Sequence, residues 1–230
     1  MMSNDTIDRL SLLIRGIDAL IAGLILGLVI SIFYTFSMLA LAGLLIHLSP
    51  VFTYVGNAVE SIITLAIYMV IFRWGFSLLV KADPKDYDIG LVGVFIIAFA
   101  SLLSLIMSIM AAIKVYQLIV NLISAVGAIE SVIGQVMIII ALYRLGYYSN
   151  ILRRSSIFLM LGFVLVYLGT IAVVLHNYLA GSDLLLTGAF IAVPSYILVI
   201  WGLNDARRTI TNLIIELSKP GGSGLFGGRT

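Results

Sequence analysis

Two stretches of the chain share one pattern that decides the fold: Ala-Val-Glu-Ser-Ile-Ile at 58–63 and Ala-Ile-Glu-Ser-Val-Ile at 128–133. Thirteen residues after Glu60 the chain reaches Arg73, and fourteen residues after Glu130 it reaches Arg144. In each copy an apolar run with one carboxylate ends near an arginine, and a short charged loop and a second apolar run follow. Since each copy holds two spans, the pattern predicts a duplicated transmembrane hairpin with the same topology in both copies.

The composition places the whole chain in the membrane class. Hydrophobic residues make up 62% of the sequence, charged residues make up 10%, and the mean hydropathy is +1.18, which is outside the usage of soluble globular proteins. The chain has no cysteine, and this excludes disulfides, thiolate metal sites and iron–sulfur ligation. We expect neither a metal site nor a cofactor.

The apolar runs predict an all-α bundle of six transmembrane helices in a domain covering residues 1–203. The expected spans are 16–48, 51–80, 89–113, 119–142, 156–175 and 184–201. Residues 1–15 are expected to form a short interfacial helix that precedes the first span. For the fourth span an alternative stays open, because residues 115–129 are polar enough to form an outer interfacial segment with the membrane helix starting near Ala128.

Basic residues set the predicted orientation. Of the thirteen lysines and arginines, twelve fall on one side of the six expected spans and Lys114 alone falls on the other. Because short cytoplasmic loops carry an excess of Lys and Arg, both termini and the loops after the second and fourth spans are predicted to be cytoplasmic.

The C-terminal segment is expected to leave the membrane. Residues 204–219 have an apolar stripe opposite a basic face, which predicts a cytoplasmic amphipathic helix on the inner leaflet or against a partner. Residues 220–230 form a glycine-rich tail that cannot fold alone. Leu225 and Phe226 in this tail are candidate partner-docking residues, and a disordered end is the alternative.

Small residues recur at helical spacing in two spans. Gly16, Gly23, Gly27 and Ser31 share one face of the first span, and Ser101, Ser104, Ser108 and Ala112 share one face of the third. Both stripes predict close packing between helices. In the sixth span, Pro194 is expected to produce a fixed kink.

No catalytic constellation is present in the sequence. It lacks a phosphate-binding glycine loop, an H-E-x-x-H motif and a plausible Ser-His-Asp grouping, so we expect no enzymatic activity. His47 and His176, at the outer ends of two spans, leave open the alternative of haem ligation in a redox membrane anchor.

The two glutamates are the candidate transport-path residues. An ionised carboxylate in hydrocarbon costs at least ~2.5 kcal/mol, so each is expected to face the bundle interior, a partner or water, or to be protonated. One hypothesis is that Glu60 and Glu130 line a single hydrated path. The alternative is that each caps the outer end of its helix, with Asn57 and Gly127 marking the helix starts.

Two resemblances add expectations. Residues 75–79 followed by 87–90, and residues 144–147 followed by a further hairpin, resemble the repeated hairpins of a crenarchaeal membrane-protein family of unknown function. The outline of six spans, cytoplasmic ends and a glycine-rich tail resembles the polytopic membrane subunit of the crenarchaeal DNA-import system. This second resemblance implies a location in the archaeal cell membrane and DNA as a cargo. It implies no functional residue.

Together these features lead us to expect a non-enzymatic pore or platform subunit of a translocation machine, with DNA import as the leading function. Expected partners are membrane lipid, other membrane subunits, further copies of the chain and a separate ATPase, since the chain has no nucleotide site. The alternatives are a small-solute or ion transporter with carboxylates in the membrane, an accessory scaffold, or the redox anchor.

Overall fold

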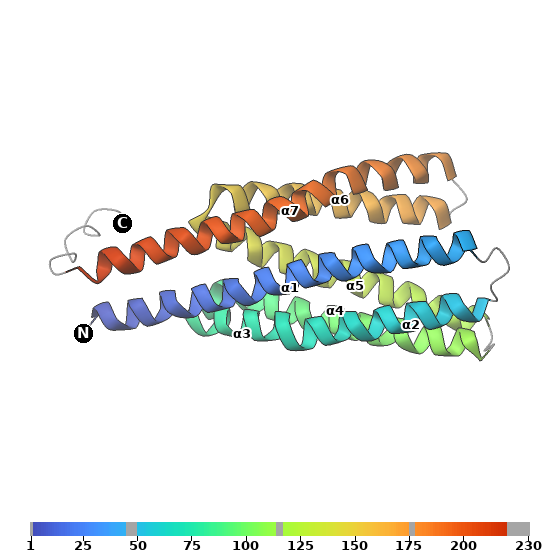
Figure 1. Ribbon diagram of the computed structural model, residues 1–230, viewed down its shortest axis with the longest axis horizontal. Helices are drawn as coiled ribbons and strands as arrows, with labels where there is room; N and C mark the ends of the chain where they lie inside the picture. The colour runs from blue at the N-terminus through green and yellow to red at the C-terminus, as the bar shows by residue number, and fades with distance from the viewer. Residues whose placement is uncertain (1, 45–49, 114–116, 175–177, 220–230) are drawn as a thin grey trace. The chain divides into compact units, whose positions relative to one another are not determined.

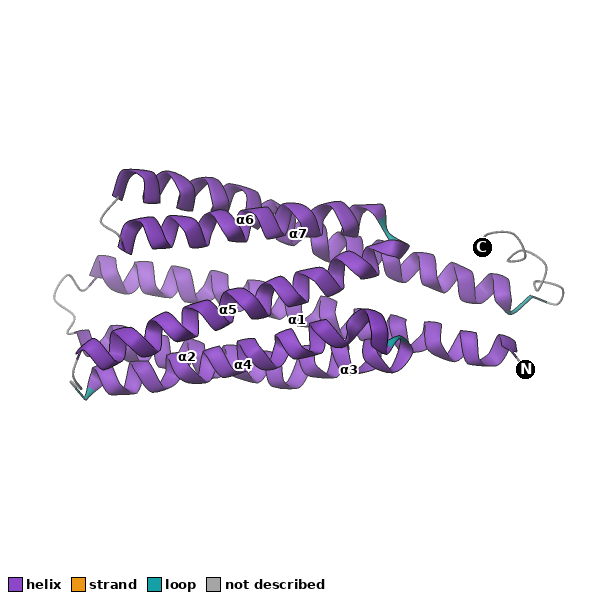
Figure 2. Ribbon diagram, turned by 180° about the vertical axis from the view of Figure 1, so that it is seen from behind, coloured by secondary structure: helices purple, strands orange, loops and turns teal. Residues whose placement is uncertain are grey.

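The computed structural model describes residues 2–44, 50–113, 117–174 and 178–219, and every regular element in these ranges is a helix (Figures 1 and 2). Six helical segments are long and apolar enough to cross a membrane: Asp5–Phe33, Tyr54–Ala82, Pro84–Ala112, Ala125–Tyr148, Asn150–Ala172 and Leu179–Leu217. The prediction of an all-α, multi-pass membrane protein is confirmed. The internal hairpin repeat stays a prediction.

The helices follow one another with few intervening residues. In chain order they are α1 (Met2–Leu44), α2 (Pro50–Ile67), the π-helix η1 (Tyr68–Phe72), α3 (Arg73–Ala82), α4 (Pro84–Ala112), α5 (Gln117–Leu145), the 3₁₀-helix η2 (Gly146–Tyr148), α6 (Asn150–Val174) and α7 (Tyr178–Leu217). The second span therefore consists of α2, η1 and α3 without a break. The chain divides into two compact units, the first made of Met1–Ile21, Gly75–Asp88 and Ile139–Thr230, and the second of Ala22–Trp74 and Ile89–Ile138.

Glycines hold α6 and α7 together in the first unit. A Cβ added at Gly162 would lie 2.7 Å from the backbone nitrogen of Ala192, and one added at Gly169 would lie 2.7 Å from that of Leu185. At Gly188 the nearest atom would be the backbone nitrogen of Val166, also at 2.7 Å. Small residues let membrane helices approach closely enough for extensive van der Waals contact, so these glycines set the spacing of the pair.

Polar contacts join other parts of the first unit. Arg144 donates hydrogen bonds of 3.1 Å to the carbonyl oxygens of both Lys85 and Asp86. The Ser149 hydroxyl donates to Asp205 Oδ2 at 2.7 Å and accepts a hydrogen bond from the Leu152 amide at the start of α6. A hydroxyl that accepts from a first-turn amide caps the helix, so Ser149 both starts α6 and ties it to α7.

A long helix lies at each end of the described part of the chain. No break separates residues 2–15 from the first span, because α1 runs from Met2 to Leu44. The predicted N-terminal segment is therefore continuous with the span, and its place at the membrane interface stays a prediction. Likewise α7 continues from Tyr178 through Pro194 to Leu217. The stripe predicted at 204–219 is partly buried, because Ala206 and Ile210 are fully covered and Arg207 pairs with Asp18 at 2.8 Å.

The second unit is almost free of charge. Among its described residues, the charged side chains are Glu60, Arg73 and Glu130. Its helices α4 and α5 meet at Gly93 and Gly134, where a Cβ on either glycine would lie within 2.8 Å of the other's carbonyl oxygen. Because an ionisable residue is rare and costly within a span, each of these three charged residues requires an explanation.

Candidate functional site

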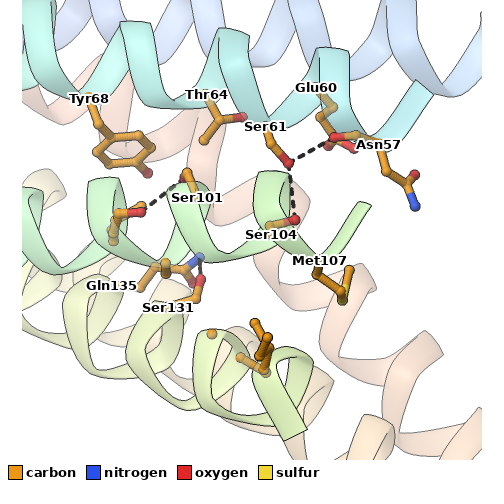
Figure 3. A pocket seen from close by; sticks show the side chains of 15 residues that line it. Asn57, Glu60, Ser61, Thr64, Tyr68, Ser101, Ser104, Met107, Ser131 and Gln135 are labelled. Atoms are coloured by element: carbon orange, nitrogen blue, oxygen red, sulfur yellow. Dashed lines mark hydrogen bonds between the residues drawn. The ribbon is translucent and has the colours of Figure 1, made fainter. Parts of the chain in front are cut away.

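A polar pocket of about 480 Å³ lies inside the second unit (Figure 3). Its walls come from α2 with the adjoining π-helix, from α4 and from α5. The lining residues are Asn57, Glu60, Ser61, Thr64, Tyr68, Ile97, Ala100, Ser101, Ser104, Met107, Ile123, Gly127, Ala128, Ser131 and Gln135. On each helix these positions recur three or four residues apart, so each helix contributes one face to the pocket.

Glu60 supplies the charge of this pocket. It is half-buried, and Figure 3 shows it on the same helix face as Ser61 and Asn57. The described residues that line the pocket include no lysine, arginine or histidine. The described lining therefore presents one carboxylate and no basic side chain, and a carboxylate within a span attracts a cation.

Serine hydroxyls in the pocket are oriented by the helices that carry them. The Ser61 hydroxyl donates to the Asn57 carbonyl at 2.8 Å and its oxygen lies 3.0 Å from Ser104 Oγ, which links α2 to α4. The Ser101 hydroxyl donates to the Ile97 carbonyl at 2.9 Å. Since a hydroxyl has one proton and two lone pairs, a proton committed to the helix backbone leaves the oxygen as an acceptor.

A π-helix forms one end of the pocket wall. Tyr68 is its first residue, lines the pocket and stacks on Phe72, with ring centroids 4.8 Å apart and an interplanar angle of 17°. The wider turn of a π-helix interrupts regular hydrogen bonding, and such turns occur often at functional sites. The apolar composition of residues 68–72 did not predict this interruption.

Glu130 lies in a different environment from Glu60. It lines an apolar groove of about 390 Å³ with Val92, Phe95, Ile96, Phe99 and Ile133. Its Oε2 atom is buried and has no hydrogen-bond partner among the described residues. Among the described residues, Glu60 and Glu130 therefore line two different pockets.

Neither glutamate caps a helix. Because α2 begins at Pro50 and α5 begins at Gln117, the first turn of each helix contains no acidic residue. The capping alternative is wrong, since Asn57 and Gly127 are interior positions of continuous helices. The α5 helix is also unbroken from Gln117 to Leu145.

The serine stripe of α4 has a second role that its spacing did not reveal. Ser101 and Ser104 line the pocket, whereas Ser108 is 1% exposed and donates to the Ser104 carbonyl at 2.9 Å. The sequence feature that could have indicated this pocket is the serine that follows each glutamate, because Ser61 and Ser131 both line it.

Other candidates from the sequence lie outside the described residues. These are His47, His176, Leu225, Phe226 and Lys114. Within the described ranges no group of three or more His, Asp or Glu side chains is arranged to hold a metal ion. Comparisons with family models, curated proteins and solved structures find no match to this chain.

Proposed function

We propose that this chain is a membrane transport protein that binds a small organic cation in the pocket between α2, α4 and α5. The observation that carries the proposal is a polar pocket whose described lining holds one carboxylate, Glu60, and no basic residue, in a unit with only two other charged side chains among its described residues. An acidic residue within a span marks a substrate or ion pathway by default. This function corresponds to the transporter alternative predicted from the sequence.

The pocket chemistry favours an amine over an anion. Ser61 and Ser101 direct their protons to backbone carbonyls, so their oxygens accept hydrogen bonds from a ligand. A protonated amine is a donor with no acceptor, and it would complement both these oxygens and Glu60. Tyr68 adds an aromatic ring, which attracts cations through its face.

The pocket volume favours a small organic molecule. A cavity of about 480 Å³ falls within the ~300–1,000 Å³ range of small-molecule sites. A bare alkali ion instead needs a tight cage of oxygen ligands. The preferred ligand therefore has a protonated amine and a short apolar part, which Ile97, Ala100 and Met107 would contact.

DNA import remains a proposal that rests on the resemblance alone. The Glu60 carboxylate would repel phosphate, so this pocket favours a cationic ligand over a nucleic acid. A role as a pore or platform subunit would instead depend on other membrane subunits and a separate ATPase. Co-purification with an ATPase and DNA-dependent transport would support that role, and neither result requires the pocket.

Two serines of α4 provide a matched test of the cation pocket. Ser101→Ala is expected to weaken binding of propylammonium about 3- to 10-fold, because one neutral hydrogen bond contributes ~1 kcal/mol. Ser108→Ala should leave the affinity unchanged, since Ser108 makes the same type of backbone hydrogen bond outside the pocket lining. Affinity is measured by ligand-dependent thermal stabilisation of the purified protein and by uptake into proteoliposomes.

Propionate serves as the anionic control because it matches propylammonium in size. Stabilisation and uptake with propylammonium and not with propionate are the expected result. Equal responses to the two ions, or a response to propionate alone, would reject a cation site.

The proposed orientation places both termini on the cytoplasmic side of a cell membrane. Ser182 on α7 and Lys85 on α4 are both exposed, and the distribution of basic residues predicts that they lie on opposite sides. In intact cells an impermeant thiol reagent should label Ser182→Cys and should label Lys85→Cys only after permeabilisation. Labelling of Lys85→Cys in intact cells would reverse the orientation.

A further inference from the structure

The unexplained acid of the second unit is Glu130, which the cation pocket does not use. It lies near the middle of α5, a helix of 29 residues. At a rise of ~1.5 Å per residue, a central position in such a helix is about 20 Å from either end and falls within the ~30 Å hydrocarbon core when the helix spans it. The carboxyl group is therefore beyond the depth at which a short side chain reaches the interface.

The described residues that line the groove around Glu130 include no basic side chain. From α4 the groove presents Val92, Phe95, Ile96 and Phe99, and from α5 it presents Ile133, none of which titrates. Among the described residues, Arg73 is a charged group that contacts the groove lining: its Cζ lies 5.8 Å from the centroid of the Phe95 ring. No ion pair joins Arg73 to Glu130 in the described part of the chain.

The buried Oε2 atom of Glu130 favours the neutral acid over the ionised carboxylate. A carboxylate in hydrocarbon loses its hydration without gaining a partner, at a cost of at least ~2.5 kcal/mol. The neutral acid avoids the charge, and in this groove its O–H group is in contact with apolar side chains. Proton binding thus removes the largest unfavourable interaction that the geometry imposes on Glu130.

We infer that Glu130 is a proton-binding site in an apolar groove between α4 and α5, chemically separate from the Glu60 pocket. The groove is about 390 Å³ and is lined by the exposed side chains of Phe95, Phe99 and Ile133, so an apolar reagent dissolved in the bilayer can enter it. Release and uptake of this proton would give the transporter a coupling ion. The coupling of proton movement to transport rests on the proposed function, whereas proton binding at Glu130 does not.

A hydrophobic carbodiimide tests this inference on the unmodified chain. Dicyclohexylcarbodiimide reacts with a protonated carboxyl group: the acid oxygen adds to the central carbon, the acid proton moves to a nitrogen, and acyl migration gives a stable N-acylurea. We expect the peptide containing Glu130 to gain the mass of one carbodiimide in membranes treated with the reagent. Modification should decrease as the pH rises, because the ionised form supplies no proton.

Two variants locate the reaction. Glu60→Gln should keep the modification of Glu130, whereas Glu130→Gln should lose it. The inference is overturned if the carbodiimide does not react with Glu130 in the chain of natural sequence, or if it reacts with Glu60 alone. It is also overturned if a water-soluble carbodiimide reacts with Glu130 more readily than the hydrophobic reagent does. The mass readout involves no ligand, so failure of propylammonium binding would reject the cation pocket and leave this result standing.

Discussion

Glu60→Gln is expected to lower the affinity for propylammonium by about 30-fold or more, because a charge-assisted hydrogen bond contributes ~2 kcal/mol or more. The amide keeps the shape of the side chain and removes the negative charge that Glu60 gives the described pocket lining. The folded protein should not lose stability, since a carboxylate within a span is costly. Ligand-dependent thermal stabilisation and proteoliposome uptake measure the loss of affinity.

Two further substitutions distinguish the effect on affinity of a charge in the pocket from the effect of a charge elsewhere in the protein. Glu60→Asp keeps the carboxylate but shortens its reach, so binding should be weaker than in the unmodified chain and stronger than in Glu60→Gln. Asp183→Asn removes an exposed carboxylate on α7 in the first unit and should leave the affinity unchanged. Equal affinities of Glu60→Gln and the unmodified chain would place the ligand outside this pocket.

The helical fold could be predicted because its signal is large and local. Long apolar runs, polar loops and breaker residues such as Pro50 and Pro84 mark spans without any knowledge of packing. Helix continuity was harder to predict. Residues 204–217 are polar enough to leave a membrane, yet they extend α7 because Ala206 and Ile210 are buried within the first unit.

The site could be predicted only in part, because helix rotation is not visible in a short motif. Glu60 and Ser61 both line the polar pocket, but in the second copy of the motif Ser131 lines it and Glu130 lines the apolar groove. Neighbouring residues on a helix differ by about 100° in direction, so a modest rotation moves one of them out of a shared pocket. The packing of α4 against α5 sets that rotation.

Gly134→Ala is the second substitution with a large expected effect, and it tests that packing. An added Cβ would lie 2.6 Å from the Ile97 side chain and 2.8 Å from the Gly93 carbonyl oxygen. The backbone atom cannot move aside without displacing α4, so we expect a loss of about 1–3 kcal/mol of stability, as in overpacked cores. The loss is measured as a lower midpoint of thermal or denaturant unfolding in detergent.

Gly127→Ala is the matched control on the same helix. The nearest atom to its added Cβ is 3.6 Å away, which is ordinary contact, so the change should stabilise by up to about 1 kcal/mol through helix propensity. Opposite signs at the two glycines would show that the close approach of α4 and α5 holds this pair together. A stabilising Gly134→Ala would mean that the helices are not held at this distance.

The partner glycine extends the test to the contact itself. Gly93→Ala places a Cβ 2.7 Å from the Gly134 carbonyl oxygen, so it should also separate α4 from α5. Once one substitution has separated the helices, the second meets a contact that is already relaxed, and the double variant should lose less stability than the sum of the single losses. Additive losses would show that the two glycines pack independently. Because Ser101 and Ser131 lie on these same two helices, separation should also weaken propylammonium binding in each single variant.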